Sequence, residues 1–161
     1  MKKNLAGFTL TELIITLAIL LILTGLTSVN LLGFYAKNTL NTTVPTLVSD
    51  LKQQQLKAMV GDTDGETSHD AYGIYFQSDR YTLFQGSTYS TADTSNFDIL
   101  LNRDLQFSNI ILPSSQVVFA SGSGEVANYN PSFDYVTLKN TSTDETKTVR
   151  INRYGTVIDI Y

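Results

Sequence analysis

The chain has 161 residues, enough for one modest domain and one long additional element, and this length excludes a large multidomain enzyme. Its formal net charge is -4, from 11 Lys and Arg against 15 Asp and Glu, so it lacks the basic excess typical of nucleic-acid-binding proteins. It has no Cys, so neither disulfides nor a thiolate metal cluster can hold the fold.

The first element in chain order is an apolar segment, residues 13–36, which contains no charged side chain. As a helix that rises about 1.5 Å per residue, this segment is long enough to cross a bilayer core of about 30 Å. Lys2 and Lys3 precede it, and the positive-inside bias places the N-terminus in the cytoplasm. We therefore predict a single-pass membrane protein whose globular part is extracytoplasmic.

A removable secretory signal is the alternative interpretation of this segment. Such a signal has a short apolar region and a small-x-small cleavage site, whereas this run is long and Leu26-Thr27-Ser28 is a weak site. Glu12 also lies inside the start of the run. A carboxylate there costs free energy in the membrane, so Glu12 is a functional candidate.

The residues that precede the apolar run form a distinctive leader, Lys2-Lys3-Asn4-Leu5-Ala6-Gly7-Phe8-Thr9-Leu10-Thr11-Glu12-Leu13. This leader resembles the class III leader of type IV prepilins and type II secretion pseudopilins. The resemblance implies cleavage between Gly7 and Phe8 by prepilin peptidase, N-methylation of Phe8, and a role for Glu12 in assembly. In the plainer interpretation, Gly7 and Phe8 flank a signal anchor and Glu12 snorkels at the membrane interface.

The spacing between Phe8 and Glu12 is also reasonable on physical grounds. Cleavage creates an ammonium at Phe8, and a carboxylate four residues along a helix lies near the positive end of the helix dipole. The resemblance implies that Glu12 meets the Phe8 amine of a neighbouring subunit. It also implies three partners besides the membrane: other pilin or pseudopilin subunits, prepilin peptidase and an inner-membrane assembly platform.

A second helical segment is predicted after Lys37. Poor helix formers and Pro45 predict a kink or a short unwound stretch near residues 38–45. Gly61 is the predicted helix stop. Apolar residues between these points recur at helical spacing, less regularly toward the end: Val44, Leu47, Val48, Leu51, Ala58, Met59 and Val60.

Short runs rich in Tyr, Phe, Val and Ile follow and predict antiparallel strands at residues 72–77, 80–85, 97–101, 105–112, 116–120, 133–139, 147–152 and 156–160. Residues 86–96 are predicted to be a polar loop. The fold class is therefore α+β, a pilin fold in which the lower half of a long N-terminal helix packs on an antiparallel sheet or small sandwich. The expected division is a leader at 1–7, a membrane and assembly helix at 8–36, and a globular domain at 37–161, with its helix at 37–61 and its β-rich part at 62–161.

Three further landmarks resemble an H-type minor pseudopilin or its pilus relative. They are Tyr72-Gly73-Ile74-Tyr75-Phe76, Val117-Val118-Phe119 running to Gly122, and Arg150-Ile151-Asn152-Arg153-Tyr154-Gly155-Thr156-Val157. The lack of Cys removes the disulfide-bounded loop of many major pilins, which favours a minor subunit.

The sequence contains no convincing catalytic constellation, so an enzyme is not expected. Asp62, Asp64, Glu66 and Asp70 supply oxygen ligands at a spacing that suggests a Ca2+ loop. Gly65 and the missing twelfth-position Glu depart from the EF-hand pattern, and a solvated acidic loop is the preferred interpretation.

Arg150 and Arg153 are the candidate DNA contacts, because some minor pilins bind DNA through Arg near the C-terminus. Two arginines neutralise few phosphates, so nucleic acid is not the expected partner. The sequence thus predicts a structural minor subunit of a type IV pilus or a type II secretion pseudopilus. The alternatives are a DNA-uptake minor pilin and a membrane-anchored surface binding module.

Overall fold

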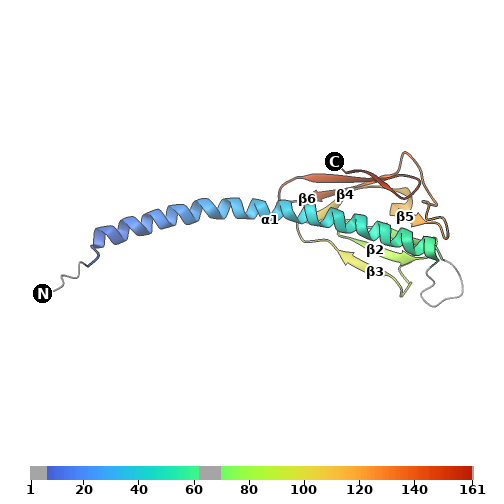
Figure 1. Cartoon of the computed structure of the whole chain (residues 1–161), viewed down its shortest axis with the longest axis horizontal. Coiled ribbons are helices and arrows are strands. Elements are labelled where there is room, and N and C mark those ends of the chain that lie inside the picture. Colours follow the sequence, from blue (N-terminus) through green and yellow to red (C-terminus); the bar gives the residue numbers. More distant parts are fainter. Residues whose placement is uncertain (1–6, 62–69, 161) are drawn as a thin grey trace. The chain divides into compact units, whose positions relative to one another are not determined.

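The computed structural model describes residues 7–61 and 70–160, and within these ranges the side chains at 26–38 and 159 are not described. The chain divides into two compact units, Met1–Tyr35 and Ala36–Tyr161, and helix α1 (Leu10–Val60) contributes to both. Within the second unit, α1 is followed by the strands (Figure 1). These are β1 (Tyr72–Phe76), β2 (Arg80–Gln85), β3 (Phe97–Leu100), β4 (Leu105–Ile111), β5 (Gln116–Phe119), β6 (Tyr135–Asn140), β7 (Thr146–Ile151) and β8 (Val157–Ile160).

The strands form two antiparallel four-stranded sheets. One has the strand order β3-β2-β1-β5, and the other has the order β4-β6-β7-β8. Every strand named here begins and ends within two residues of its predicted bounds. The α+β class and the antiparallel arrangement predicted from the sequence are therefore confirmed.

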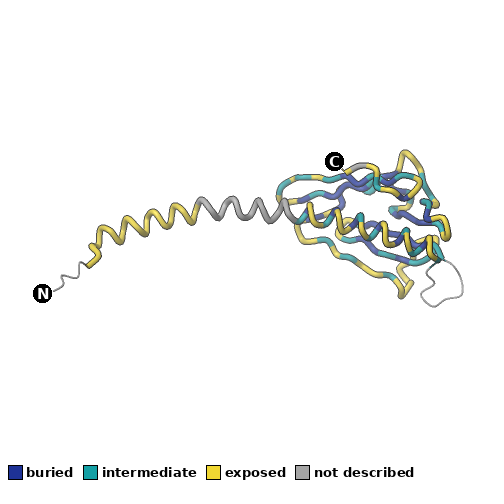
Figure 2. The backbone as a smooth tube through the Cα atoms, viewed as in Figure 1, coloured by how far each residue is buried: buried dark blue, intermediate teal, exposed yellow. Residues whose placement is uncertain are grey.

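The second half of α1 is held by a stripe of buried side chains. Figure 2 shows that this part of the tube has buried and exposed residues in alternation. The stripe contains Leu40, Val44, Leu47, Leu51, Gln54 and Ala58. Its steps of three and four residues keep it on one face of the helix, which is the pattern of a helix that packs on a core. Met59 and Val60, which were predicted to continue the stripe, are exposed.

The short unwound stretch that was one prediction for residues 38–45 is wrong, because α1 is helical without interruption through Pro45. The kink, which was the other, stays a prediction. Proline removes one backbone hydrogen bond and crowds the preceding turn. Here the neighbours of Pro45 compensate: Val44 and Leu47 are almost completely buried, at 2% and 0% exposed. Burying an aliphatic side chain contributes about 1.5 to 3 kcal/mol, so two such side chains offset a cost of about 3 kcal/mol.

The predicted stop at Gly61 is confirmed. Gly61 adopts a left-handed conformation, φ 71°, and its N–H donates to the carbonyl of Lys57 at 3.1 Å. This is a left-handed C-terminal cap, which glycine adopts without the steric cost of a Cβ atom.

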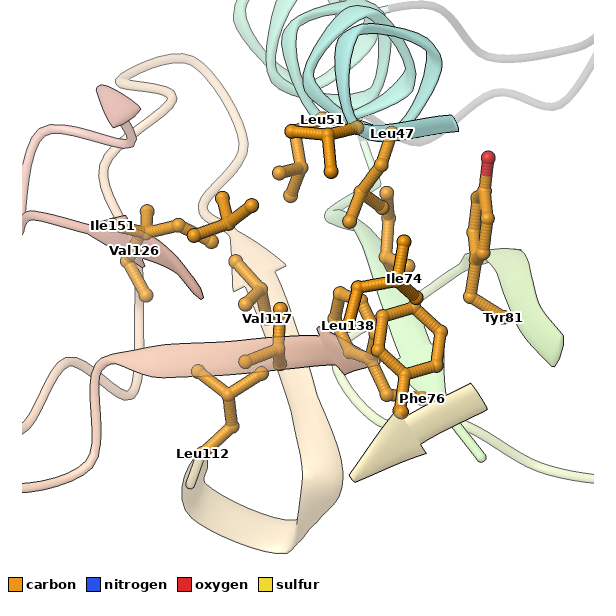
Figure 3. Packing of buried hydrophobic residues seen from close by; sticks show 14 of the residues in the cluster. Leu47, Leu51, Ile74, Phe76, Tyr81, Leu112, Val117, Val126, Leu138 and Ile151 are labelled. Carbon is orange, nitrogen blue, oxygen red and sulfur yellow. The ribbon is translucent and has the colours of Figure 1, made fainter. Parts of the chain in front are cut away.

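The core joins α1 to both sheets (Figure 3). Leu47 and Leu51 of α1 lie over Ile74 of β1, and Leu138 of β6 lies beside Phe76. Phe76 meets Phe107 of β4 edge to face, with ring centroids 5.3 Å apart. A single apolar cluster therefore replaces the cross-links that a Cys-free chain lacks.

A polar contact at the edge of this core fixes the helix against β2. The Tyr81 hydroxyl donates to Asp50 Oδ2 of α1 at 2.5 Å, while the Tyr81 side chain is almost fully buried. Burial raises the pKa of Tyr81, and the hydrogen bond to Asp50 raises it further. Tyr81 therefore stays protonated at neutral pH and remains a donor to the helix.

The loop at residues 86–96 is more ordered than its polar composition predicted. Tyr89 stacks on Tyr75 with ring centroids 4.1 Å apart, and its backbone N–H donates to Gln116 Oε1 at 3.1 Å. Phe84 meets the Tyr89 ring edge to face at 5.8 Å. One aromatic side chain thus attaches the loop to the sheet that contains β1, β2 and β5.

Gln55 connects the end of α1 to two loops of the globular unit. Its Nε2 donates to the carbonyls of Gly124 at 2.9 Å and Tyr154 at 2.7 Å. Gly124 and Gly155 are both left-handed, with φ 66° and 72°. A Cβ atom at Gly155 would lie 2.5 Å from Gln55 Nε2 and 2.8 Å from the ring of the buried Phe119.

We predict that Gly155→Ala destabilises the protein more than Gly122→Ala does. Both glycines are left-handed, at φ 72° and 77°, but a Cβ atom at Gly122 meets nothing within 4 Å. The two variants therefore share the backbone strain, and Gly155→Ala alone adds overpacking, which costs about 1 to 3 kcal/mol. Urea denaturation of both variants measures the difference, and equal free energies of unfolding would contradict the clash.

Candidate processing and assembly site

The residues around the predicted cleavage point are accessible. Phe8 is 79% exposed, and a Cβ atom built at Gly7 would meet nothing within 4 Å. Helix α1 begins immediately afterwards, at Leu10. The Gly7–Phe8 peptide bond therefore lies in non-helical chain next to a helix start, which suits a bond that a peptidase must bind in extended form.

A capping box fixes the start of the helix. The backbone N–H and the hydroxyl of Thr9 donate to Glu12 Oε2, at 3.0 and 2.9 Å. In return, the Glu12 N–H donates to Thr9 Oγ1 at 3.3 Å. This reciprocal pair satisfies backbone donors that the first turn of a helix leaves without partners.

The role of Thr9 was not predicted from the sequence. The signal was present, because Thr9 followed by Glu12 and an apolar run is the Thr-x-x-Glu pattern of a capping box. The Glu12 carboxylate accepts a backbone hydrogen bond in addition to carrying a charge. Glu12 thus has a local structural role besides any role in assembly.

The capping box also places the Glu12 charge. The carboxylate lies at the N-terminal end of α1, where the helix dipole favours a negative group. Its hydrogen-bond donor Thr9 is the residue directly after Phe8. A new amine on Phe8 would therefore arise one residue away from a group that already contacts this carboxylate.

The side chains of α1 that follow Glu12 are apolar and exposed. Leu13, Ile14, Ile15, Leu17, Ile19, Leu20, Leu21, Ile22 and Leu23 are each more than half exposed. Among the residues that the structure describes, no helix combines the length and the apolar character needed to cross a membrane.

Comparison with known families matches residues 2–28 to the family described as the prokaryotic N-terminal methylation motif. The chain carries the type IV pilin signature. The pilin signature covers the leader, Phe8, the capping box and the first part of α1. No curated protein and no solved structure matches the chain.

The pilin signature supports a type IV pilin-like protein that is processed by prepilin peptidase and assembles with other pilin subunits. The α+β architecture is consistent with a pilin fold. The resemblance to an H-type minor pseudopilin stays a prediction, because the match ends at residue 28.

The first sequence landmark of that resemblance, residues 72–76, is strand β1. Within this strand, Gly73 leaves room for the ring of Phe84.

The predicted Ca2+ loop lies mostly outside the described residues, which exclude Asp62, Asp64 and Glu66. Asp70 is described, and its Oδ2 accepts a hydrogen bond from Gln85 Nε2 at 2.9 Å. Within residues 7–61 and 70–160, no three His, Asp or Glu side chains are grouped as a metal ion would require. Calcium binding stays a prediction of the sequence.

The two predicted DNA contacts each face a carboxylate. Arg150 Nε lies 3.2 Å from Oδ1 of the buried Asp134 and forms an ion pair with it. The Arg150 guanidinium also lies over the Tyr135 ring, 5.7 Å from its centroid. Arg153 donates to Glu125 Oε2 at 3.3 Å. These contacts give both arginines a structural explanation.

We predict that Thr9→Val frays the first turn of α1, whereas Thr9→Ser does not. Valine keeps the shape of threonine but removes the hydroxyl that bonds the Glu12 N–H and carboxylate. Loss of an N-cap costs about 1 kcal/mol, which corresponds to about fivefold faster amide exchange in that turn. Hydrogen exchange of the full chain in detergent micelles measures the effect. Equal exchange in both variants would show that the hydroxyl does not hold the turn.

Proposed function

We propose that this protein is a minor pilin or pseudopilin subunit that is anchored in the membrane before it joins a filament. The observation that carries this proposal is the methylation motif at residues 2–28, in which Glu12 follows Phe8 at the spacing of one helical turn. The apolar, exposed side chains after Glu12 are suited to lipid first and to neighbouring helices later.

Processing is the first step. Prepilin peptidase cleaves between Gly7 and Phe8, which removes Lys2 and Lys3 and leaves an amine on Phe8 that is then methylated. The N-terminus is cytoplasmic before cleavage, because the two lysines precede the apolar run. The unit Ala36–Tyr161 is then extracytoplasmic.

Assembly is the second step, and Glu12 drives it by its charge. In lipid, a carboxylate and an amine are each expensive unless they are paired. When a subunit joins the filament, its Glu12 meets the Phe8 amine of a neighbour, and both charges are neutralised. Donors on Thr9 already orient the carboxylate, so the assembly contact begins from an ordered group.

A structural role fits the globular unit better than DNA uptake does. Arg150 and Arg153 are engaged by Asp134 and Glu125, so phosphate binding would have to displace these carboxylates. The chain also has no Cys and therefore lacks the disulfide-bounded loop of many major pilins, which supports a minor position in the filament.

We predict that the mature chain begins at a methylated Phe8. N-terminal mass spectrometry of the protein from cells with active prepilin peptidase measures this, and cells without the peptidase provide the control. A chain that still begins at Met1 when the peptidase is active, or one that begins after Ser28, would contradict the proposed processing.

The next prediction separates the two roles of Glu12. Glu12→Gln keeps an acceptor for the Thr9 donors, because Gln also completes a capping box, but it removes the charge. Glu12→Ala removes both. If the charge drives assembly, both variants are cleaved normally and both enter filaments at least about tenfold less than the wild type.

The measurement is the ratio of each variant in sheared filaments or cross-linked complexes to its membrane pool. Thr9→Val is the matched control, because it weakens the cap and keeps the Glu12 charge. Wild-type incorporation of Glu12→Gln together with poor incorporation of Glu12→Ala would show that Glu12 acts only as a cap. Wild-type incorporation of both variants would overturn any assembly role for Glu12.

A further inference from the structure

Strand β3 lies at one end of its sheet, and in the described residues it pairs only with β2 (Figure 1). Its register with β2 pairs Tyr81 with Ile99 and Leu83 with Phe97. The Leu101 N–H continues this pattern by donating to the Asp79 carbonyl at 2.9 Å. Odd-numbered positions therefore bond β2, and the backbone groups of Asp98 and Leu100 point away from the sheet.

The usual defences of an edge strand are weak here. Edge strands are commonly protected by charged side chains, Pro or bulges. The register of β3 with β2 has no bulge, and β3 contains no Pro. Its one charged side chain, Asp98, accepts hydrogen bonds from the Thr82 hydroxyl at 2.6 Å and from Arg80 Nη1 at 3.4 Å.

The side chains of β3 are instead apolar and accessible. Phe97 is 64% exposed and Leu100 is 67% exposed. Exposed apolar side chains on an edge with available backbone groups are typical of a strand that accepts another strand. This surface belongs to the unit Ala36–Tyr161 and is separate from the N-terminal assembly site.

Two cavities between α1 and β3 follow the strand. The first has a volume of about 200 Å³ and is lined by Thr43 and Thr46 of α1 and by Ile99, Leu100 and Leu101. The second has a volume of about 180 Å³ and is lined by Gln53, Gln54 and Lys57 of α1, by Tyr72 of β1, by Leu83, Phe84 and Gln85 of β2, and by Ser95 and Phe97. The first cavity is bordered by threonines and apolar side chains, whereas the second combines three Gln side chains with aromatic and aliphatic ones.

The distance between the two cavities matches the distance between side chains four residues apart on an extended strand. On α1, Thr43 and Gln54 are about 16 Å apart along the helix axis, at about 1.5 Å per residue. On β3, Phe97 and Leu101 are about 13 Å apart, at about 3.3 Å per residue. Side chains four residues apart on an added strand share one face and have the same spacing of about 13 Å, so one strand can fill both cavities.

The second cavity is bordered by Gln54, whose buried side-chain oxygen favours a hydrogen-bond donor. Gln54 is 4% exposed, and its Oε1 has no hydrogen-bond partner among the described residues. A buried acceptor without a partner costs free energy, so a ligand that donates to it is favoured. The Lys57 ammonium on the same wall disfavours a cationic donor. A neutral amide side chain donates to such an oxygen and carries no charge that this ammonium would repel.

We propose that β3 is a docking edge for an extended segment of another protein, which carries an aliphatic side chain and, four residues away, a Gln or Asn side chain. The segment adds to β3 through the backbone of Asp98 and Leu100. Its aliphatic side chain enters the cavity beside Leu100, and its amide enters the cavity beside Gln54. This inference concerns the globular unit and does not depend on the proposed processing.

The test uses the full chain in detergent micelles and labelled seven-residue threonine peptides. One peptide has valine at its second position and glutamine at its sixth, and another has the reverse order. Fluorescence anisotropy measures binding. We expect at least one of the two orders to bind, and lysine in place of either valine or glutamine to weaken that binding about tenfold.

Two substitutions of Leu100 test whether its backbone N–H binds the peptide. Leu100→Pro removes a backbone N–H that points away from β2, which edge strands tolerate, whereas Leu100→Ala removes the same side chain and keeps the N–H. We expect Leu100→Pro to bind about tenfold more weakly than Leu100→Ala, and both variants to unfold at similar temperatures. Unfolding temperatures exclude a general loss of fold.

Three results would overturn the proposal. In the first, neither peptide order binds. In the second, Leu100→Pro and Leu100→Ala bind the peptide equally well. In the third, the peptides that contain lysine bind as tightly as the peptide with valine and glutamine. Concentration-dependent self-association that Leu100→Pro abolishes would replace the proposed partner with a second copy of this chain. Because no peptide experiment involves Gly7 or Phe8, failure here leaves the N-terminal mass analysis independent.

Discussion

The contact on which the globular unit depends is the buried stripe of α1 between Leu40 and Ala58. This stripe supplies the helical part of a core that includes side chains from both sheets. No disulfide assists it, because the chain has no Cys. The stripe also explains why the helix tolerates Pro45: the free energy of burying Val44 and Leu47 is large enough to keep the surrounding turns helical.

The two ends of α1 are stabilised by different chemistry, each suited to its place. At the start, Thr9 and Glu12 satisfy one another and hold a negative charge near the new terminus that cleavage would create. At the other end, Gly61 closes the helix through its own backbone, and Gln55 fastens the last turns to two loops. Backbone groups at both ends of α1 are thus hydrogen-bonded within the chain.

The sequence predicted most of the fold because period-two alternation marks strands that bury one face, such as Tyr72, Ile74 and Phe76 in β1. It failed where the outcome depends on contacts between distant residues. The local propensity of Pro45 does not reveal the buried contacts that keep this stretch helical. The polar composition of residues 86–96 correctly predicts a loop, but not the contacts of Tyr89 with Tyr75 and Gln116, which are distant in sequence. At the site, the motif predicts roles for Gly7, Phe8 and Glu12, but not for Thr9, whose capping role depends on the local geometry that brings its hydroxyl to Glu12.

The N-terminal motif and the edge of β3 lie in different parts of the chain. The residues matched by the methylation motif support processing and assembly as a pilin-like protein, and the match ends at residue 28, before the unit Ala36–Tyr161 begins. On β3, the pairing of Asp98 with Arg80 and Thr82 uses the one charge that would repel a second strand. Because the charge of Asp98 is paired within its own sheet, the outer backbone groups of β3 can bond another strand. The side chains that line the two cavities would then select the partner.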